Sequence, residues 1–135
     1  MSRRVARDSA YKLIFEYLFR KEKDDFTLEL LCADSNITQA DKQYIQTVYE
    51  GVMTHFDELT ELISSCTTDF NPERIFKPDL AALLLAVYEM KYMDDIPLPV
   101  SVSEVLDIVK SYSTDKSASF VNGVLAGVYK KLEEK

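Results

Sequence analysis

P-D-L-A-A-L-L-L-A-V-Y-E-M, residues 78–90, is the stretch of this 135-residue sequence that decides the fold. Its apolar residues occupy more than one face of a helix, which is typical of a helix buried on several sides. Pro78 suits the first helical position, where no N–H is needed, and Asp79 suits the positive end of the helix dipole. The pattern predicts a central, largely buried helix over residues 78–93, with other elements packed around it.

Helices are also predicted on both sides of this stretch, because apolar residues recur there at steps of three and four. The predicted ranges are 5–21, 24–34, 38 to about 66, a short helix beginning at Pro72, 101–112, and a last helix that opens at Ser119 with S-F-V-N-G-V-L. The sequence therefore predicts an all-α fold of about seven helices in one domain.

Capping residues and helix breakers set the expected boundaries. Thr38 and Ser101 are expected N-caps, each with an acidic residue three positions later. Gly51 and His55 are expected to kink or break the long third helix. The run 94–99 contains two prolines and is expected to be extended.

Composition is that of an ordinary globular domain, with 47% apolar and 29% charged residues. Three glycines and four prolines are few, which favours long helices over many turns. No apolar run is long enough to span a membrane, and no signal peptide is apparent, so a cytoplasmic location is expected. Cys32, Cys66 and the single His55 form no ligand pattern, so we predict two buried thiols, no metal site and no cofactor.

Charge is distributed unevenly along the chain. Residues 1–23 hold seven basic and three acidic residues, a net +4, which leaves −11 on the rest of a chain of net charge −7. Over a Debye length of about 8 Å the local sign matters more than the total. A basic N-terminus is therefore compatible with an anionic partner.

Two stretches leave a structural and a functional interpretation open. Phe120, Asn122 and Gly123 either pack at a helix crossing or offer a ring and an amide to a ligand, with Gly123 allowing close approach. Phe15 and Phe19 lie off the main apolar stripe, and are either a second core contact or a docking site. We find no nucleophile with an assignable base and no phosphate-binding loop, so the chain is not expected to be an enzyme.

Four motifs, in this order along the chain, resemble the NusB family of transcription antitermination factors. They are R-R-V-A-R-D-S-A-Y-K-L-I-F at 3–15, D-L-A-A-L-L-L-A-V-Y-E-M at 79–90, D-I-P-L-P-V-S-V-S-E-V at 95–105 and F-V-N-G-V-L at 120–125. The resemblance implies a NusB-like RNA-binding domain over residues 1–135, built as two small helical subdomains, about 1–66 and about 72–135. It implies binding of single-stranded boxA leader RNA together with NusE, a small-subunit ribosomal protein, and tethering of that RNA to elongating RNA polymerase through other Nus factors.

The resemblance also implies roles for individual residues. RNA contact is expected of Arg3, Arg4, Arg7, Lys116, Phe120 and Asn122, and contact with the NusE partner is expected of Phe15, Phe19, Asp79 and Glu89. The sequence departs from the common family residues at Leu84 (arginine), Ser103 (asparagine) and Ala126 (aspartate). Lys116 stands where an acid can occur, which should strengthen RNA contact.

Two other functions fit the same residues. NusB-like domains resemble the N-terminal module of ribosomal RNA cytosine methyltransferases, although this chain stops at Lys135 without the glycine-rich turn of a cofactor domain. A helical adaptor that binds only proteins would show no RNA affinity even with NusE present. The sequence leaves open whether the chain is a monomer or a homodimer.

Overall fold

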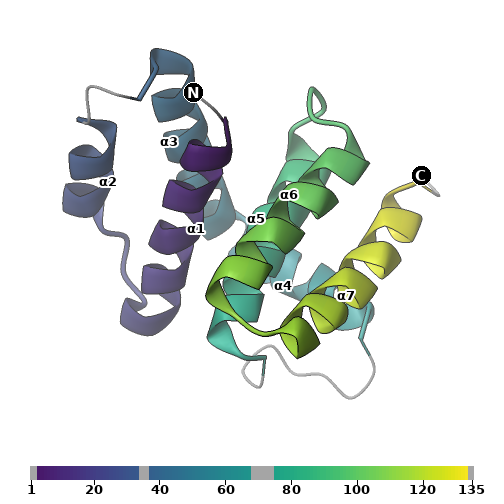
Figure 1. The fold of residues 1–135 in the computed structure, drawn as a ribbon. Coiled ribbons are helices and arrows are strands. Elements are labelled where there is room, and N and C mark those ends of the chain that lie inside the picture. The colour runs from purple at the N-terminus through teal and green to yellow at the C-terminus, as the bar shows by residue number, and fades with distance from the viewer. Residues whose placement is uncertain (1–2, 34–36, 68–74, 134–135) are drawn as a thin grey trace.

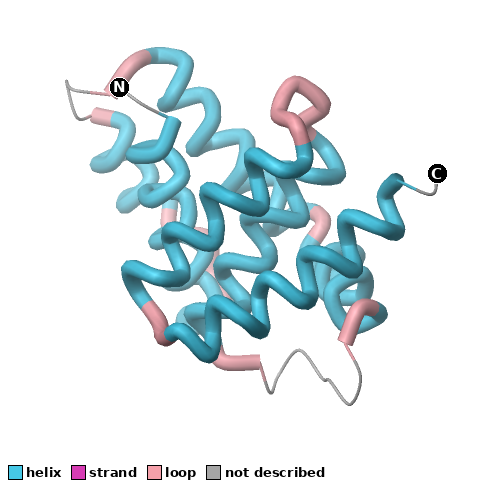
Figure 2. Tube along the Cα trace, turned by 45° about the vertical axis from the view of Figure 1, so that its right-hand side comes forward, coloured by secondary structure: helices cyan, strands magenta, loops and turns pink. Residues whose placement is uncertain are grey.

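The computed structural model describes residues 3–33, 37–67 and 75–133. Seven α-helices and no strand occur in these ranges (Figures 1 and 2). The helices are α1 (Arg3–Arg20), α2 (Asp25–Cys32), α3 (Gln39–Thr54), α4 (Phe56–Ser65), α5 (Lys77–Tyr92), α6 (Leu98–Tyr112) and α7 (Asp115–Glu133). The predicted all-α fold of about seven helices is confirmed.

Helix α5 is the centre of the bundle. It contacts α1, α3, α4, α6 and α7, and every residue from Ala81 to Val87 is fully buried. Pro78 lies in its first turn, as predicted. Leu84, where the family commonly has arginine, is part of this buried run and has no access to solvent.

The other helices gather on two sides of α5. Helices α1, α2 and α3 pack together on one side, α6 and α7 pack together on the other, and α4 contacts α3, α5 and α7 (Figure 1). The buried apolar residues form one cluster that runs through both groups. The division into halves at about residues 66–72 stays a prediction. No helix in the described ranges is both long and apolar enough to cross a membrane.

Several predicted boundaries need correction. The long third helix is broken at His55 into α3 and α4, while α3 runs unbroken past Gly51. Helix α1 begins at Arg3, two residues earlier than expected, and α2 is shorter than the predicted 24–34. The Thr38 cap is confirmed, because its hydroxyl accepts a hydrogen bond from the Asp41 N–H at 3.1 Å.

The expected caps of the last two helices are wrong. Helix α6 begins at Leu98, with Pro99 in its first turn, where a missing N–H is tolerated. Ser101 is therefore inside α6 and fully buried. Thr114, not Ser119, caps α7, since its hydroxyl accepts the Ser117 N–H at 3.0 Å.

Two other expectations have different outcomes. Most of the short helix expected from Pro72 lies outside the described residues, and Ile75 and Phe76 precede α5 without being helical. Cys32 and Cys66 are free thiols, half-buried rather than fully buried.

Close packing against glycine occurs at Gly51 and not at Gly123. A Cβ atom at Gly51 would overlap the ring of Tyr88 on α5, whereas a Cβ at Gly123 would meet no atom within 4 Å. The expectation that Gly123 permits close helix approach is wrong, because this side of α7 is exposed.

We predict opposite effects of alanine at these two positions. Gly51→Ala should lower the free energy of unfolding by about 1–3 kcal/mol through overpacking. Gly123→Ala should raise it by up to about 1 kcal/mol, because alanine favours the helix and nothing obstructs its methyl group. Urea denaturation of both variants measures the change in the free energy of unfolding. Equal changes would contradict the close packing at Gly51 and the open space at Gly123.

Candidate functional site

A buried carboxylate joins four helices behind the N-terminal arginines. Glu89 on α5 is fully buried and accepts hydrogen bonds from Arg7 on α1, at 2.7 Å from Nε and 3.1 Å from the second guanidinium nitrogen. The Ser101 hydroxyl of α6 donates to the same carboxylate at 2.8 Å, and the Tyr44 hydroxyl of α3 donates as well. Because buried charges need partners, these donors make the pair tolerable in the core.

The burial of this pair corrects two expectations. Arg7 is 4% exposed, and its guanidinium is engaged by Glu89, so it does not present a free cation to RNA. Glu89 is shielded from solvent and has no surface to offer to NusE. Although burial lowers the pKa of Arg7, its hydrogen bond to Glu89 and the charge of that carboxylate raise the pKa overall, so the guanidinium stays protonated. Burial and the same carboxylate raise the pKa of Tyr44, whose hydroxyl remains a donor.

Arg3 and Arg4 lie at the surface on either side of this buried pair. The Arg3 guanidinium carbon is 4.6 Å from the centroid of the Tyr44 ring, and its Nε is 3.5 Å from Asp41. Arg4 is exposed and reaches across to α6, where one nitrogen is 3.1 Å from Glu104 and 3.3 Å from Asp107. The net +4 of the first 23 residues is thus partly compensated by carboxylates from other helices.

The ion pair of Arg4 shows in the pKa values of both partners. Its hydrogen bond to Glu104 raises the pKa of Arg4 and lowers the pKa of Glu104. A phosphate that binds Arg4 must therefore compete with a carboxylate that is ionised at neutral pH.

Residues of α7 form the second part of the predicted RNA surface. Lys116 and Asn122 are exposed, as that role requires, whereas Phe120 is half-buried and packs against the core. Because α7 begins at Asp115, four residues before Ser119, Phe120 lies inside the helix and not at its first turn. Helix α6 lies between α1 and α7 (Figure 1), so the arginines and the α7 residues flank the same helix.

A row of aromatic rings runs along α1 from its middle toward its C-terminal end. Tyr11 stacks on Phe15 with 6.4 Å between ring centroids, and Phe15 meets Phe19 edge-on at 4.8 Å. Phe15 is half-buried against the core, but Phe19 is 58% exposed. The Lys77 ammonium lies 5.4 Å from the Phe19 ring centroid. Each ring therefore fits a different one of the two interpretations. Phe15 is partly a core residue, and Phe19 is available for docking.

Asp79 does not lie where a docking residue should. It is 5% exposed, and its carboxylate accepts a hydrogen bond from the Ser113 hydroxyl at 3.2 Å. Burial raises its pKa, although the Ser117 and Ser113 hydroxyls oppose that rise. Its hydrogen bond ties α5 to the α6–α7 connection, so the expectation that it faces a partner is corrected.

Two exposed rings near this row were missed by the sequence reasoning. Phe76 is 60% exposed and immediately precedes Lys77. Tyr112, at the end of α6, stacks on Tyr11 at 5.4 Å. Helical periodicity gives no signal for Phe76, which lies outside a helix, or for a contact between rings about 100 residues apart.

We predict that Glu89 is essential for the fold. Glu89→Gln should lower the free energy of unfolding by roughly 3–5 kcal/mol, because Arg7 is left as an unpaired buried charge. Glu58→Gln is the matched control, since the ion pair of Glu58 with Lys91 is partly open to solvent, with side chains 39% and 25% exposed, and ion pairs screened by solvent contribute less than buried ones. Chemical denaturation measures both, and equal stabilities of the two variants would contradict the role of the buried pair.

Comparisons with known proteins identify the family. The NusB family model matches residues 4–130. The "Transcription antitermination protein NusB" of Agathobacter rectalis is 39% identical over 129 residues, covering 93% of this chain and 98% of that protein. Among solved structures, T. maritima NusB is similar with a TM-score of 0.87 and 28% identity, over 97% of this chain and 92% of that one.

A second solved structure shows a relative in a complex. It is a crystal structure of antitermination factors NusB and NusE in complex with double-stranded RNA, and its matched chain has a TM-score of 0.85 and 25% identity, with 96% of each chain covered. Together with the arrangement of α1, α5, α6 and α7 described above, these matches show that the chain belongs to the NusB family.

Proposed function

We propose that this chain is a transcription antitermination factor that binds boxA-type single-stranded leader RNA together with NusE. Other Nus factors then connect the bound RNA to elongating RNA polymerase in the cytoplasm. The observation that carries the proposal is the match, over nearly the whole of both chains, to a NusB protein whose complex contains NusE and RNA. That complex contains double-stranded RNA; the single-stranded target rests on the sequence motifs.

Arg3 and Arg4 are the phosphate-binding end of the proposed surface. Both residues belong to the first turn of α1, where Arg4 is exposed and faces α6, and Arg3 is half-buried against the Tyr44 ring of α3. Arg4 has a planar fork of donors, which suits a phosphate, although Glu104 and Asp107 already occupy part of it. Arg7 contributes by holding α1 in place, not by touching RNA.

Residues of α7 supply the other end of the proposed surface. Single-stranded RNA is bound by stacking splayed bases on rings and by hydrogen bonds to their edges. Lys116 can meet a phosphate, Asn122 can bond a base edge, and the accessible part of the half-buried Phe120 ring can stack a base. An RNA strand that joins the two ends would cross α6.

The exposed Phe19 is the centre of the proposed NusE surface, where it meets the ring of Phe15 edge-on and has Lys77, the residue after the exposed Phe76, against its face. This surface and the RNA surface share helix α1. If NusE increases RNA affinity, the RNA must increase NusE affinity by the same factor, because coupling free energies are reciprocal.

A gel shift with a boxA-type single-stranded RNA tests the proposal directly. We expect weak retention by the chain alone and much stronger retention when NusE is added. Retention that is equally weak with NusE present, despite a detectable complex of the two proteins, would instead indicate an adaptor that binds only proteins.

We predict that Arg3 and Arg4 each make one phosphate contact. Changing both to Ala should reduce the slope of log affinity against log salt by about 1.4, since each contact to a single strand contributes about 0.7. Arg20→Ala, at the far end of α1, is the control and should leave the slope unchanged. Unaltered slope in the double variant would refute the assignment.

We predict that Phe19→Ala weakens NusE binding by about 2 kcal/mol or more, as truncation of a central aromatic contact does. Its stability should fall by less than about 1 kcal/mol, because the ring is mostly in solvent. Phe26→Ala on α2, which removes a ring that is 70% exposed, should change neither quantity. Calorimetric titration and thermal melting measure both; a large loss of stability with normal NusE binding would mean that Phe19 belongs to the core.

A further inference from the structure

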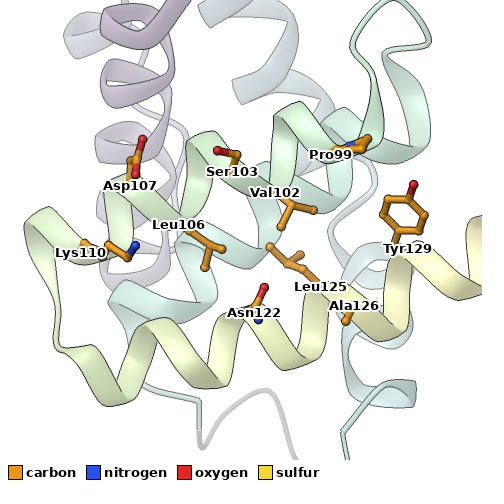
Figure 3. Close-up of a pocket in the computed structure, with 10 residues that line it drawn as sticks. All are labelled: Pro99, Val102, Ser103, Leu106, Asp107, Lys110, Asn122, Leu125, Ala126 and Tyr129. Carbon is orange, nitrogen blue, oxygen red and sulfur yellow. The ribbon is translucent and has the colours of Figure 1, made fainter.

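A groove of about 490 Å³ lies between α6 and α7 (Figure 3). Val102 and Leu106 of α6 and Leu125 of α7 form its apolar floor, and the ring of Tyr129 lies at one end. Ala126 lines one wall of the groove, and its small side chain leaves space there. The volume falls within the range of about 300–1,000 Å³ typical of small-ligand sites.

Polar groups without partners gather around this apolar floor. Asn122 offers an amide, Ser103 a hydroxyl and Lys110 an ammonium group, and all three line the groove. In the described part of the chain, none of these side chains takes part in a hydrogen bond or ion pair of the kind that engages Arg3, Arg4, Lys12 and Lys91. The groove thus combines apolar contact area with free donors and an acceptor.

The groove is continuous with the arginine end of the RNA surface. Asp107 lines it, and the same carboxylate accepts a hydrogen bond from Arg4 at 3.3 Å. Arg4 and Asp107 also line the neighbouring cleft between α1 and α6. A strand whose phosphates meet Arg4 is therefore within reach of the groove, and the pairing of Asp107 with Arg4 reduces repulsion along the way.

We propose that this groove binds one unstacked base of the single-stranded RNA, an inference that rests on the proposed function. The flat faces of the base would lie against the apolar floor and the Tyr129 ring, its edge would bond Asn122 and Ser103, and Lys110 would meet the adjoining phosphate. A leucine or phenylalanine of a protein partner would fill the floor equally well. It would, however, displace water from the amide and the hydroxyl without replacing their hydrogen bonds, which is unfavourable. A base has flat apolar faces that cover the floor and a polar edge that replaces the hydrogen bonds of the amide and the hydroxyl.

The test combines a variant that fills the groove with RNAs that lack single bases. In the wild-type complex with NusE, replacing each base of the boxA-type RNA in turn by an abasic nucleotide should reveal one position whose loss weakens affinity about tenfold or more. Ala126→Phe should weaken the binding of the intact RNA by a similar factor. The two losses should not add when combined, because they remove the same contact.

A second variant and a control complete the design. Asn122→Leu keeps the size of the side chain but removes the amide, and should also abolish the effect of that one abasic position. Gln46→Phe places a phenylalanine at an exposed position of α3, away from the groove, and should bind every RNA like the wild type. Thermal melting of each variant shows that the fold persists.

Three results would overturn the inference. If Ala126→Phe and Asn122→Leu bind intact RNA normally, the groove does not hold a base, although the proposed function stands. If Ala126→Phe instead weakens NusE binding or changes the sedimentation of the chain alone, the occupant is a protein. If the wild-type complex binds no RNA at all, the proposed function itself fails, and with it this inference.

Discussion

The fold depends on one buried ion pair, between Arg7 of α1 and Glu89 of α5. Two charges taken out of water are stable only when further donors complete their hydrogen bonding, and here Tyr44 and Ser101 supply them. The carboxylate therefore fixes the mutual positions of α1, α3, α5 and α6. Because α1 carries Arg3 and Arg4 in its first turn, the same interaction also sets where these cations lie on the surface.

Helix α6 links the electrostatics of the protein to its binding surfaces. It presents Glu104 and Asp107 to Arg4 on one side and forms the apolar wall of the groove on the other. RNA phosphates that approach the arginines must compete with these carboxylates, so the gain from each phosphate contact is smaller than for a free arginine. In the proposed RNA complex of this acidic protein of net charge −7, stacking of bases and the contribution of NusE would then matter more for affinity than charge alone.

The two proposed surfaces differ in how they relate to the core. Phe19 projects from a row of rings that continues inward through Phe15 to Tyr11, so a partner bound at the proposed surface would rest on packed aromatic rings. In contrast, Asn122, Ser103 and Lys110 of the α6–α7 groove take part in no hydrogen bond or ion pair within the described part of the chain. The first surface suits a protein with a complementary apolar face, whereas the second suits a ligand with both flat apolar faces and a polar edge.

Local sequence alone determined the helical character of the chain, the burial of α5 and the Thr38 cap, but not every helix boundary, because periodicity, proline position and capping chemistry act over a few residues. The ordered motifs also determined the family. Only the tertiary structure decided that Arg7 is buried against Glu89, that Ser101 is a core donor and not a cap, and that Gly51 rather than Gly123 is closely packed. Each of these depends on a side chain that lies at least 12 residues away in sequence, such as Glu89 or Tyr88, and the free energy of burying a charge or a ring is set by such neighbours.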